Sequence, residues 1–374
     1  MLTAVACSTI FVYGMMSALL GALVPSYNLN ASQQGNLALM NALGLVISSS
    51  MAGPMVDWRG KKSGLLAGLV VICAALMASP NSAVYGSLLG VYFALGIGGG
   101  TISTSVNSLA SDLASERRGS ALNFVNLFFG LGGVVTTLAA SYLLSGAMLC
   151  YLIAALAAGA LLLTVLVPIT KRKNEISFHL NQVSALLHNP TLLALSLLLF
   201  LYVACEVGVW NWLKIYLISI HFDARTAGGI VSYGFAFGML VGRGAASRVL
   251  VHASALRVII VSGVLIAVTT FSMLHVSSQA GVTIAVFSAG LAMAPVFPTT
   301  LSVVGAHFPK AAASAIGIAI TSGWLGLAVS SPVIGAIAER GTLHSGLLLI
   351  PAFAVAMVLV ALVLNIRLRI IART

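Results

Sequence analysis

Long apolar segments alternate with short polar breaks along the whole chain of 374 residues. A helix needs roughly 20 mostly apolar residues to cross a bilayer, and the pattern predicts twelve such helices. They cover residues 2–24, 34–56, 63–79, 82–108, 119–144, 146–168, 191–217, 226–249, 256–275, 279–303, 311–336 and 343–366. Because the apolar runs are continuous and do not alternate with a period of two, we expect helices and no membrane β-barrel.

The break at 169–190 is the longest segment that is not expected to span, and it divides the helices into two groups of six. We therefore predict one six-helix bundle at 1–168, a cytoplasmic linker at 169–190 and a second bundle at 191–374. Small residues also recur 194 positions apart, in the pairs Gly96 and Gly290, Ser108 and Ser302, Ser120 and Ser314, and Gly132 and Gly326. This spacing aligns helices four and five with helices ten and eleven, so the sequence predicts an all-α membrane protein of two pseudo-symmetric bundles.

Composition and charge agree with a membrane location. Hydrophobic residues make up 60% of the chain, charged residues 7%, and the net charge is +11, while the mean hydropathy is +1.09. When twelve helices are threaded in order, all eighteen Lys and Arg residues except Lys214, Arg225 and Arg340 fall on one side. The positive-inside rule puts that side, with both termini, in the cytoplasm. We expect a monomeric multi-pass protein of the bacterial inner membrane that does not bind nucleic acid.

Glu206 is the only one of the seven carboxylates that lies inside a predicted span. An ionisable group at membrane depth is costly and indicates function. Tyr202, Glu206 and Trp210 recur every four residues, so they share one face of the helix. Aromatic rings can stack on a sugar ring, and a carboxylate can accept hydroxyl hydrogens or carry a proton. We predict that Glu206 couples protons or binds solute; the alternative is a structural acid that bonds to a neighbouring helix.

Other polar or aromatic side chains at membrane depth are candidates for solute contact: Asn41, Asn107, Asn123, Asn126, Asn211, Lys214 and Trp324. Amides suit a neutral, hydroxyl-rich ligand, although they serve equally well to join helices. Lys214 lies roughly 12 Å from Glu206 along the helix axis at 1.5 Å per residue. It is either a lysine that snorkels to the outer interface or a cavity cation that favours an anionic solute.

The predicted cytoplasmic turn after the second helix combines glycine, aspartate and cations at a regular spacing. Gly53, Asp57, Gly60 and Lys62 match the signature of the major facilitator superfamily, which the chain resembles here; Trp58 stands where a basic residue is usual. The resemblance implies alternating access by two rocking bundles around a central cavity. We expect a conformational latch, a charge cluster that pairs with a neighbouring helix in one state and releases it in another. Its residues are Gly53, Asp57, Arg59, Gly60, Lys62, Arg117 and Arg118.

The second half keeps part of this signature. The expected loop at 238–257 retains Gly242, Arg243 and Arg248 but has no acid. We therefore expect that the second copy of the latch is degenerate and that Glu206 is isolated from other charges.

A narrower resemblance is to the fucose permease type of sugar transporter. It rests on Leu201–Glu206 with Trp212 and Tyr216, on the segment from Asn107 to Asn126, and on Ala294–Thr299. The resemblance implies import of a neutral sugar, often with a proton. The acids that fucose permease uses in helices one and four are absent from this chain. The resemblance therefore does not imply proton coupling by that pair of acids.

Several alternatives remain open: a sugar facilitator, an exporter of amphipathic drugs or lipids, an organic anion transporter that uses Lys214, and a non-transporting sensor. Drug exporters of this superfamily usually carry an Arg in helix four and a Gly-Pro pair in helix five, and neither is present. The sequence shows no group of His, Cys or paired acidic residues that would indicate an enzyme. We expect no cofactor and no metal. The cysteines Cys7, Cys73, Cys150 and Cys205 are isolated, which favours a packing role.

Overall fold

The structure is a computed structural model that describes residues 1–23, 29, 31–82, 84–142, 144, 146–169 and 180–371. Eleven stretches within this part of the chain are helical, long and apolar enough to cross a membrane. The remaining predicted span, 226–249, corresponds to three consecutive helical pieces between Ala224 and Val249. The expected all-α class is confirmed. The chain groups into two compact units.

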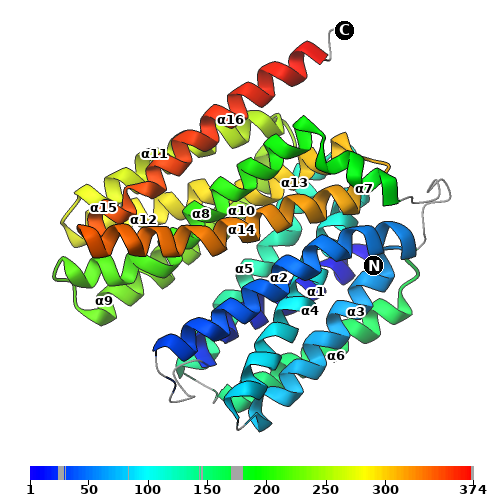
Figure 1. Cartoon of the computed structure of the whole chain (residues 1–374), viewed down its shortest axis with the longest axis horizontal. Coiled ribbons are helices and arrows are strands. Elements are labelled where there is room, and N and C mark those ends of the chain that lie inside the picture. Colours follow the sequence, from blue (N-terminus) through cyan, green and yellow to red (C-terminus); the bar gives the residue numbers. More distant parts are fainter. Residues whose placement is uncertain are drawn as a thin grey trace. The chain divides into compact units, whose positions relative to one another are not determined.

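Unit 1 contains residues Met1–Leu187 and Val304–Thr321. Its helices are α1 (Leu2–Leu23), α2 (Ala31–Arg59), α3 (Lys61–Ala78), α4 (Tyr85–Leu113), α5 (Arg118–Tyr142), α6 (Gly146–Leu166) and α7 (Leu180–Leu187). Helix α2 packs on α4, α1 on α5, and α3 on both α4 and α6 (Figure 1). The first turns of α14 (Ala312–Arg340) also belong to this unit.

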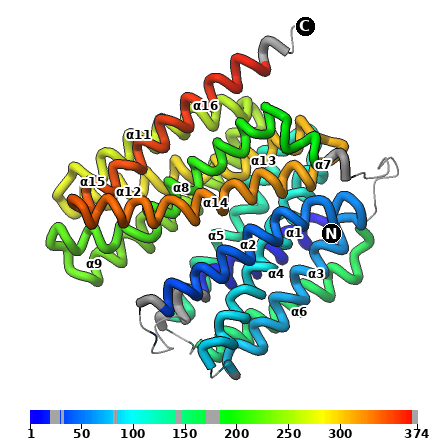
Figure 2. The backbone as a smooth tube through the Cα atoms, in the orientation of Figure 1, coloured from blue at the N-terminus to red at the C-terminus, as the bar shows by residue number. Residues whose placement is uncertain are grey.

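Unit 2 contains residues His188–Val303 and Ser322–Thr374. Its helices are α8 (Pro190–Ser219), α9 (Ala224–Gly229), the π-helical η3 (Ile230–Ala236), α10 (Phe237–Val249), α11 (Ala255–His275), α12 (Gln279–Met293), α15 (Leu343–Leu347) and α16 (Leu349–Ile371). Helix α13 (Val296–His307) begins in this unit, and α14 ends in it. Helices α8 and α11 pack on α16, and η3 and α10 pack on α12; the tube in Figure 2 can be followed through them in chain order.

The predicted 194-residue repeat reappears as a repeated helix crossing. A Cβ added to Gly96 would lie 2.2 Å from the Asn41 carbonyl oxygen, and one added to Gly44 would lie 2.4 Å from the Phe93 carbonyl oxygen. In unit 2, 194 positions later, Gly290 faces the Phe235 carbonyl at 2.4 Å and Gly238 faces the Phe287 carbonyl at 2.3 Å. Such distances exclude any side chain, so each crossing requires glycine on both helices.

Local sequence explains several helix ends in unit 2. The side chain of Asn189 accepts hydrogen bonds from the amides of Thr191 and Leu192 at 3.0 and 3.2 Å and caps α8. Asp223 caps α9 in the same way, and hydrogen bonds from Thr226 hold the pKa of this carboxyl below its ordinary value. Pro295 follows the end of α12 and separates it from α13.

Candidate functional site

Glu206 lies near the middle of the 30-residue helix α8 in unit 2 and is partly accessible. Its carboxyl interacts electrostatically with Arg243, and Tyr202 and Trp210 lie one turn to either side of it on the same helix. A carboxylate in this span therefore has a cation and two side chains with polar hydrogens in its surroundings. This arrangement can hold either a charged or a protonated acid.

Arg243 corrects two expectations. It does not lie in a cytoplasmic loop but inside α10, where it is only 5% exposed. Glu206 is therefore not isolated from other charges. The predicted span 226–249 already contained Arg243, but the sequence grouped it with the surface cations because Arg248 and Arg257 follow it. In the structure Arg243 is buried inside α10. A buried Arg inside the predicted span 226–249 indicates a functional site for the same reason as the carboxylate of Glu206.

The two aromatic residues on the Glu206 face are packed against other helices of unit 2. Tyr202 is fully buried, and its ring centroid lies 6.4 Å from that of Phe297 in α13. Trp210 is 40% exposed and meets Phe235 of η3 edge to face at 5.0 Å. Tyr202 therefore connects α8 to α13, and Trp210 connects α8 to η3. Glu206, which lies between them on the same face of α8, and part of Trp210 remain accessible.

The remaining candidates in unit 2 are spread along α8 and α14. The Asn211 amide donates to the Ser331 hydroxyl of α14 at 2.8 Å. Lys214 is exposed, and its Cε lies 3.8 Å from the Cβ position of Gly228 in α9. Its stem thus covers α9 near the end of α8, which agrees with a snorkelling lysine. Trp324 lies within α14 and is partly exposed.

In unit 1, three of the four candidate asparagines lie in one buried region. The side-chain amide of Asn126 in α5 donates to the side-chain Oδ1 of Asn107 in α4 at 2.8 Å and also to the backbone carbonyl of Leu122. Asn107 donates to Ser103 and Asn123 to Gly119, each one turn back along its own helix. Asn41 is partly exposed and donates to the Tyr92 carbonyl of α4 at 3.2 Å. The Asn107–Asn126 pair joins two helices, which favours the interhelical role for these two amides.

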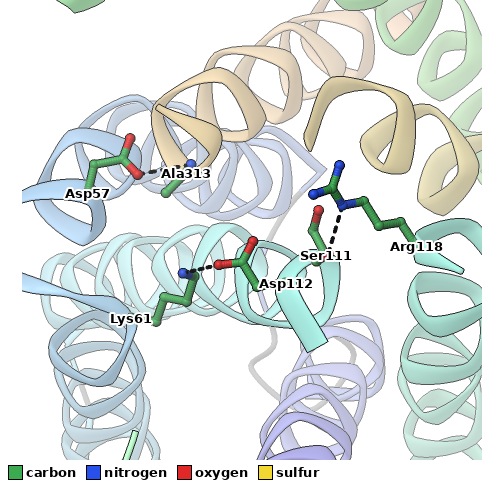
Figure 3. A network of polar contacts seen from close by, with 6 residues as sticks. All are labelled: Asp57, Lys61, Ser111, Asp112, Arg118 and Ala313. Carbon is green, nitrogen blue, oxygen red and sulfur yellow. Dashed lines mark hydrogen bonds and ion pairs between the residues drawn. The ribbon is translucent and has the colours of Figure 1, made fainter. Parts of the chain in front are cut away.

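The predicted latch residues of α2 meet the start of α14. Asp57 accepts hydrogen bonds from the backbone amides of Ala313 and Ser314 at 3.1 and 2.7 Å, as Figure 3 shows for Ala313. These amides belong to the first turn of a helix, where donors have no partner within the helix and the dipole favours an anion. One turn before Asp57, a Cβ on Gly53 would lie 2.6 Å from the Ala313 carbonyl oxygen. Glycine and aspartate at this spacing therefore let α2 approach α14 and cap it.

The second part of the signature closes the turn between α2 and α3. Gly60 has φ 91°, a left-handed conformation that favours glycine. Lys61 forms an ion pair with Asp112 at the end of α4 (Figure 3). Lys62 donates to the carbonyls of Val165 and Val167 at 2.8 and 3.1 Å, at the carboxyl end of α6. The two lysines thus fasten α3 to α4 and α6, where cations suit the helix dipole.

The other predicted latch cations are arranged differently. The Arg59 guanidinium lies 4.6 Å from the centroid of the Trp58 ring, so the residue in the usual basic position holds the next cation by a cation–π contact. Arg118 donates to the Ser111 carbonyl at 3.1 Å (Figure 3), and Arg117 is exposed. Lys171, Arg172 and Lys173 of the predicted linker lie outside the described residues. Within the described part of the chain, three or more His, Cys, Asp or Glu side chains nowhere gather as a metal site.

Solved membrane transporters share this fold. The fucose:proton symporter of E. coli superposes with a TM-score of 0.84 at 17% identity, covering 97% of this chain and 98% of that chain. The human organic anion transporter MFSD10 superposes with a TM-score of 0.83 at 16% identity, covering 96% and 98%. Identities this low establish a common fold and nothing finer.

Curated relatives are more distant and only partly covered. Bypass of stop codon protein 6 of Saccharomyces cerevisiae is 23% identical over 278 residues, which is 65% of this chain and 56% of that protein. Human synaptic vesicle glycoprotein 2A is 31% identical over 107 residues, 28% of this chain and 14% of that protein. The chain thus spans about half the length of the first relative and a small part of the second.

The match to a family is much broader. The model of the Major Facilitator Superfamily matches residues 2–329, nearly the whole helical chain. The match includes the signature turn at 53–62 and the crossings that repeat after 194 residues. The chain belongs to the Major Facilitator Superfamily, whose members are membrane transporters.

Proposed function

We propose that this protein is a secondary transporter that moves a small neutral solute, a monosaccharide by class, across the bacterial inner membrane by alternating access. Glu206 carries the coupling proton, Arg243 is its partner, and both termini are cytoplasmic. The protein acts as a monomer. The observation that carries this proposal is the partly accessible Glu206 beside a buried Arg243 at membrane depth.

The charges of this pair favour a neutral solute. Glu206 and Arg243 together have no net charge when the acid is ionised, so they attract neither an anion nor a cation from a distance. Hydroxyl groups can donate to the carboxylate and accept from the guanidinium. A sugar can form hydrogen bonds with both partners, whereas an apolar drug offers none to either.

Proton coupling follows from the same pair. Protonation of Glu206 removes the negative charge that interacts with Arg243, so proton binding and solute binding change each other's free energy. A site whose charge balance changes in this way can link the gradient to solute movement. The solute and the proton then move in the same direction.

The α2–α14 contact supports a conformational role for the latch. Asp57 and Gly53 hold the first turn of α14, a helix whose first turns belong to unit 1 and whose remainder belongs to unit 2. Alternating access requires that one set of contacts forms as another breaks. We assign to Asp57 the stabilisation of one of the two states.

An organic anion is the second candidate substrate class, because the human organic anion transporter MFSD10 shares the fold as closely as the sugar symporter does. Arg243 would then be the anion-binding cation. In that case a protonated Glu206 would be required for binding, and Lys214 would contribute at the outer end of α8.

Uptake into proteoliposomes distinguishes a neutral sugar from an organic anion as the substrate. Labelled neutral sugars and sugar acids are offered with and without an inward proton gradient. We expect saturable uptake of a neutral sugar that the gradient accelerates, and loss of this acceleration in Glu206→Gln. Saturable uptake of acids alone would replace the neutral solute by an anion, and indifference to the gradient would make the protein a facilitator.

The matched control is Glu339→Gln, which removes an exposed carboxylate near the end of α14. This variant should keep both the rate and the gradient dependence of the wild type. If both variants lost the gradient effect, Glu206 would have no special role in coupling.

A further inference from the structure

Two histidines that the proposed transport site does not use lie close together in unit 2. His275 ends α11, and His344 belongs to the short helix α15. Their ring centroids are 5.2 Å apart with an interplanar angle of 79°. Tyr216, near the end of α8, lies beside them, its ring centroid 6.0 Å from that of His344.

The hydrogen bond of His275 determines its tautomer. Nδ1 lies 2.8 Å from the Phe271 carbonyl oxygen. A carbonyl can only accept, so Nδ1 carries the hydrogen, and in the neutral ring Nε2 has the free lone pair. The Phe271 ring stacks on the imidazole at 4.0 Å and 24°, which holds the ring in this orientation.

The tautomer of His344 follows from a chain of two hydrogen bonds. The Tyr216 hydroxyl donates its single hydrogen to the Leu274 carbonyl at 2.8 Å. The same hydroxyl lies 3.3 Å from His344 Nδ1, and it can now only accept there. His344 Nδ1 therefore carries the hydrogen, and Nε2 of this ring also has a free lone pair.

This pattern is typical of histidines that bind a metal. A metal-binding imidazole donates its other N–H to a carbonyl or a similar acceptor, which orients the ring and increases its basicity. Both rings here have that support before any ion is present. With Zn–N bonds of about 2.0–2.1 Å and tetrahedral angles, two imidazole centroids on one ion lie roughly 5 Å apart, close to the observed 5.2 Å.

We propose that Nε2 of His275 and Nε2 of His344 bind one divalent transition-metal ion of the imidazole-preferring class, such as Zn²⁺ or Ni²⁺. Solvent completes the coordination. With two protein ligands the site binds more weakly than a structural site with four and is therefore reversible. An ion there joins the end of α11 to α15, and through Tyr216 to the end of α8.

The test uses the full-length protein in detergent, with any polyhistidine tag removed and the metal stripped by a chelator. Zn²⁺ and, separately, Ni²⁺ are titrated by calorimetry, and thermal unfolding is followed at each metal concentration. We expect saturable binding of one ion and a Tm that rises with metal concentration, because binding to the folded state stabilises it.

His275→Gln and His344→Gln should each weaken binding by at least about tenfold, and Tyr216→Phe, which removes the acceptor of the His344 N–H, by about 10–100-fold. His252→Gln is the matched control, an exposed histidine in the turn after α10, and should bind as the wild type does. The glutamine variants must keep the metal-free Tm of the wild type; if they do not, the Tyr216→Phe titration decides. Unchanged binding in the double variant His275→Gln/His344→Gln, or no saturable binding by the wild type, would overturn the site. Because no step measures transport, this result is independent of the proposed function.

Discussion

Glu206 and Arg243 are two charged side chains of unit 2 that interact electrostatically. Glu206 remains partly accessible, whereas Arg243 is almost completely buried in α10. Each removes part of the electrostatic cost of the other, so a change to either one leaves a charge uncompensated. Their effects on stability and transport should therefore depend on each other.

A double-mutant cycle tests this dependence. Glu206→Gln and Arg243→Gln should each lower the Tm, and the double variant should lose less than the sum of the two, with a coupling free energy of about 0.5–3 kcal/mol. Thermal unfolding of the four proteins in detergent measures it. Strict additivity would show that the two residues act independently.

The sequence identified Glu206 because an acid inside an apolar run is visible without a structure. It did not identify Arg243 as the partner, because an arginine near other cations at the end of a span looks the same whether it faces solvent or a helix. The signal that could have found it was present, because the predicted span at 226–249 contains Arg243, as α10 does in the structure.

Between helices, the α2–α14 contact explains why a glycine and an aspartate occur four residues apart in the signature turn. Gly53 allows the approach, and Asp57 satisfies two amides that α14 itself leaves without partners. Spacing alone predicted a charge cluster, but not which helix it would hold. That assignment needed the fold, because α14 begins 255 positions after Asp57 in the chain.

Asp57→Asn should weaken this cap, because a neutral amide interacts less favourably with a helix N-terminus by about 0.3–1 kcal/mol. We expect slower uptake with the solute specificity unchanged. The measurement is initial uptake rate against solute concentration in proteoliposomes. Asp112→Asn, which breaks the ion pair with Lys61 instead, is the comparison; equal effects of both would indicate a general loss of stability.

The repeated glycine crossings lead to a stability prediction. A Cβ at Gly290 would meet the Phe235 carbonyl at 2.4 Å, so Gly290→Ala should separate α12 from η3 and destabilise the protein by about 1–3 kcal/mol. Gly159→Ala in α6 is the control, since no atom lies within 4 Å of its Cβ position. There alanine should be neutral or stabilising because of its higher helix propensity. Thermal unfolding compares the two, and an equal loss of Tm would contradict the crossing.

For the protein as a whole, symport of a neutral solute with a proton would carry net positive charge inward. An inside-negative potassium diffusion potential should therefore accelerate uptake even without a pH difference, by zFΔψ of about 2.3 kcal/mol per 100 mV. Glu206→Gln should lose this acceleration. Labelled uptake with valinomycin measures it, and uptake that ignores the potential in the wild type would favour a facilitator.

The amino-acid sequence alone was sufficient to predict an integral membrane protein with all-helical spans, an internal repeat and a special role for Glu206. Each of these depends on properties that are local or periodic along the chain: apolar length, glycine spacing and the cost of an isolated charge. Only the tertiary structure showed that Arg243 interacts electrostatically with Glu206, that Asp57 caps α14, and that the rings of His275 and His344 lie close together. These pairings join residues far apart in sequence, and only the packing of helices decides which side chains face one another.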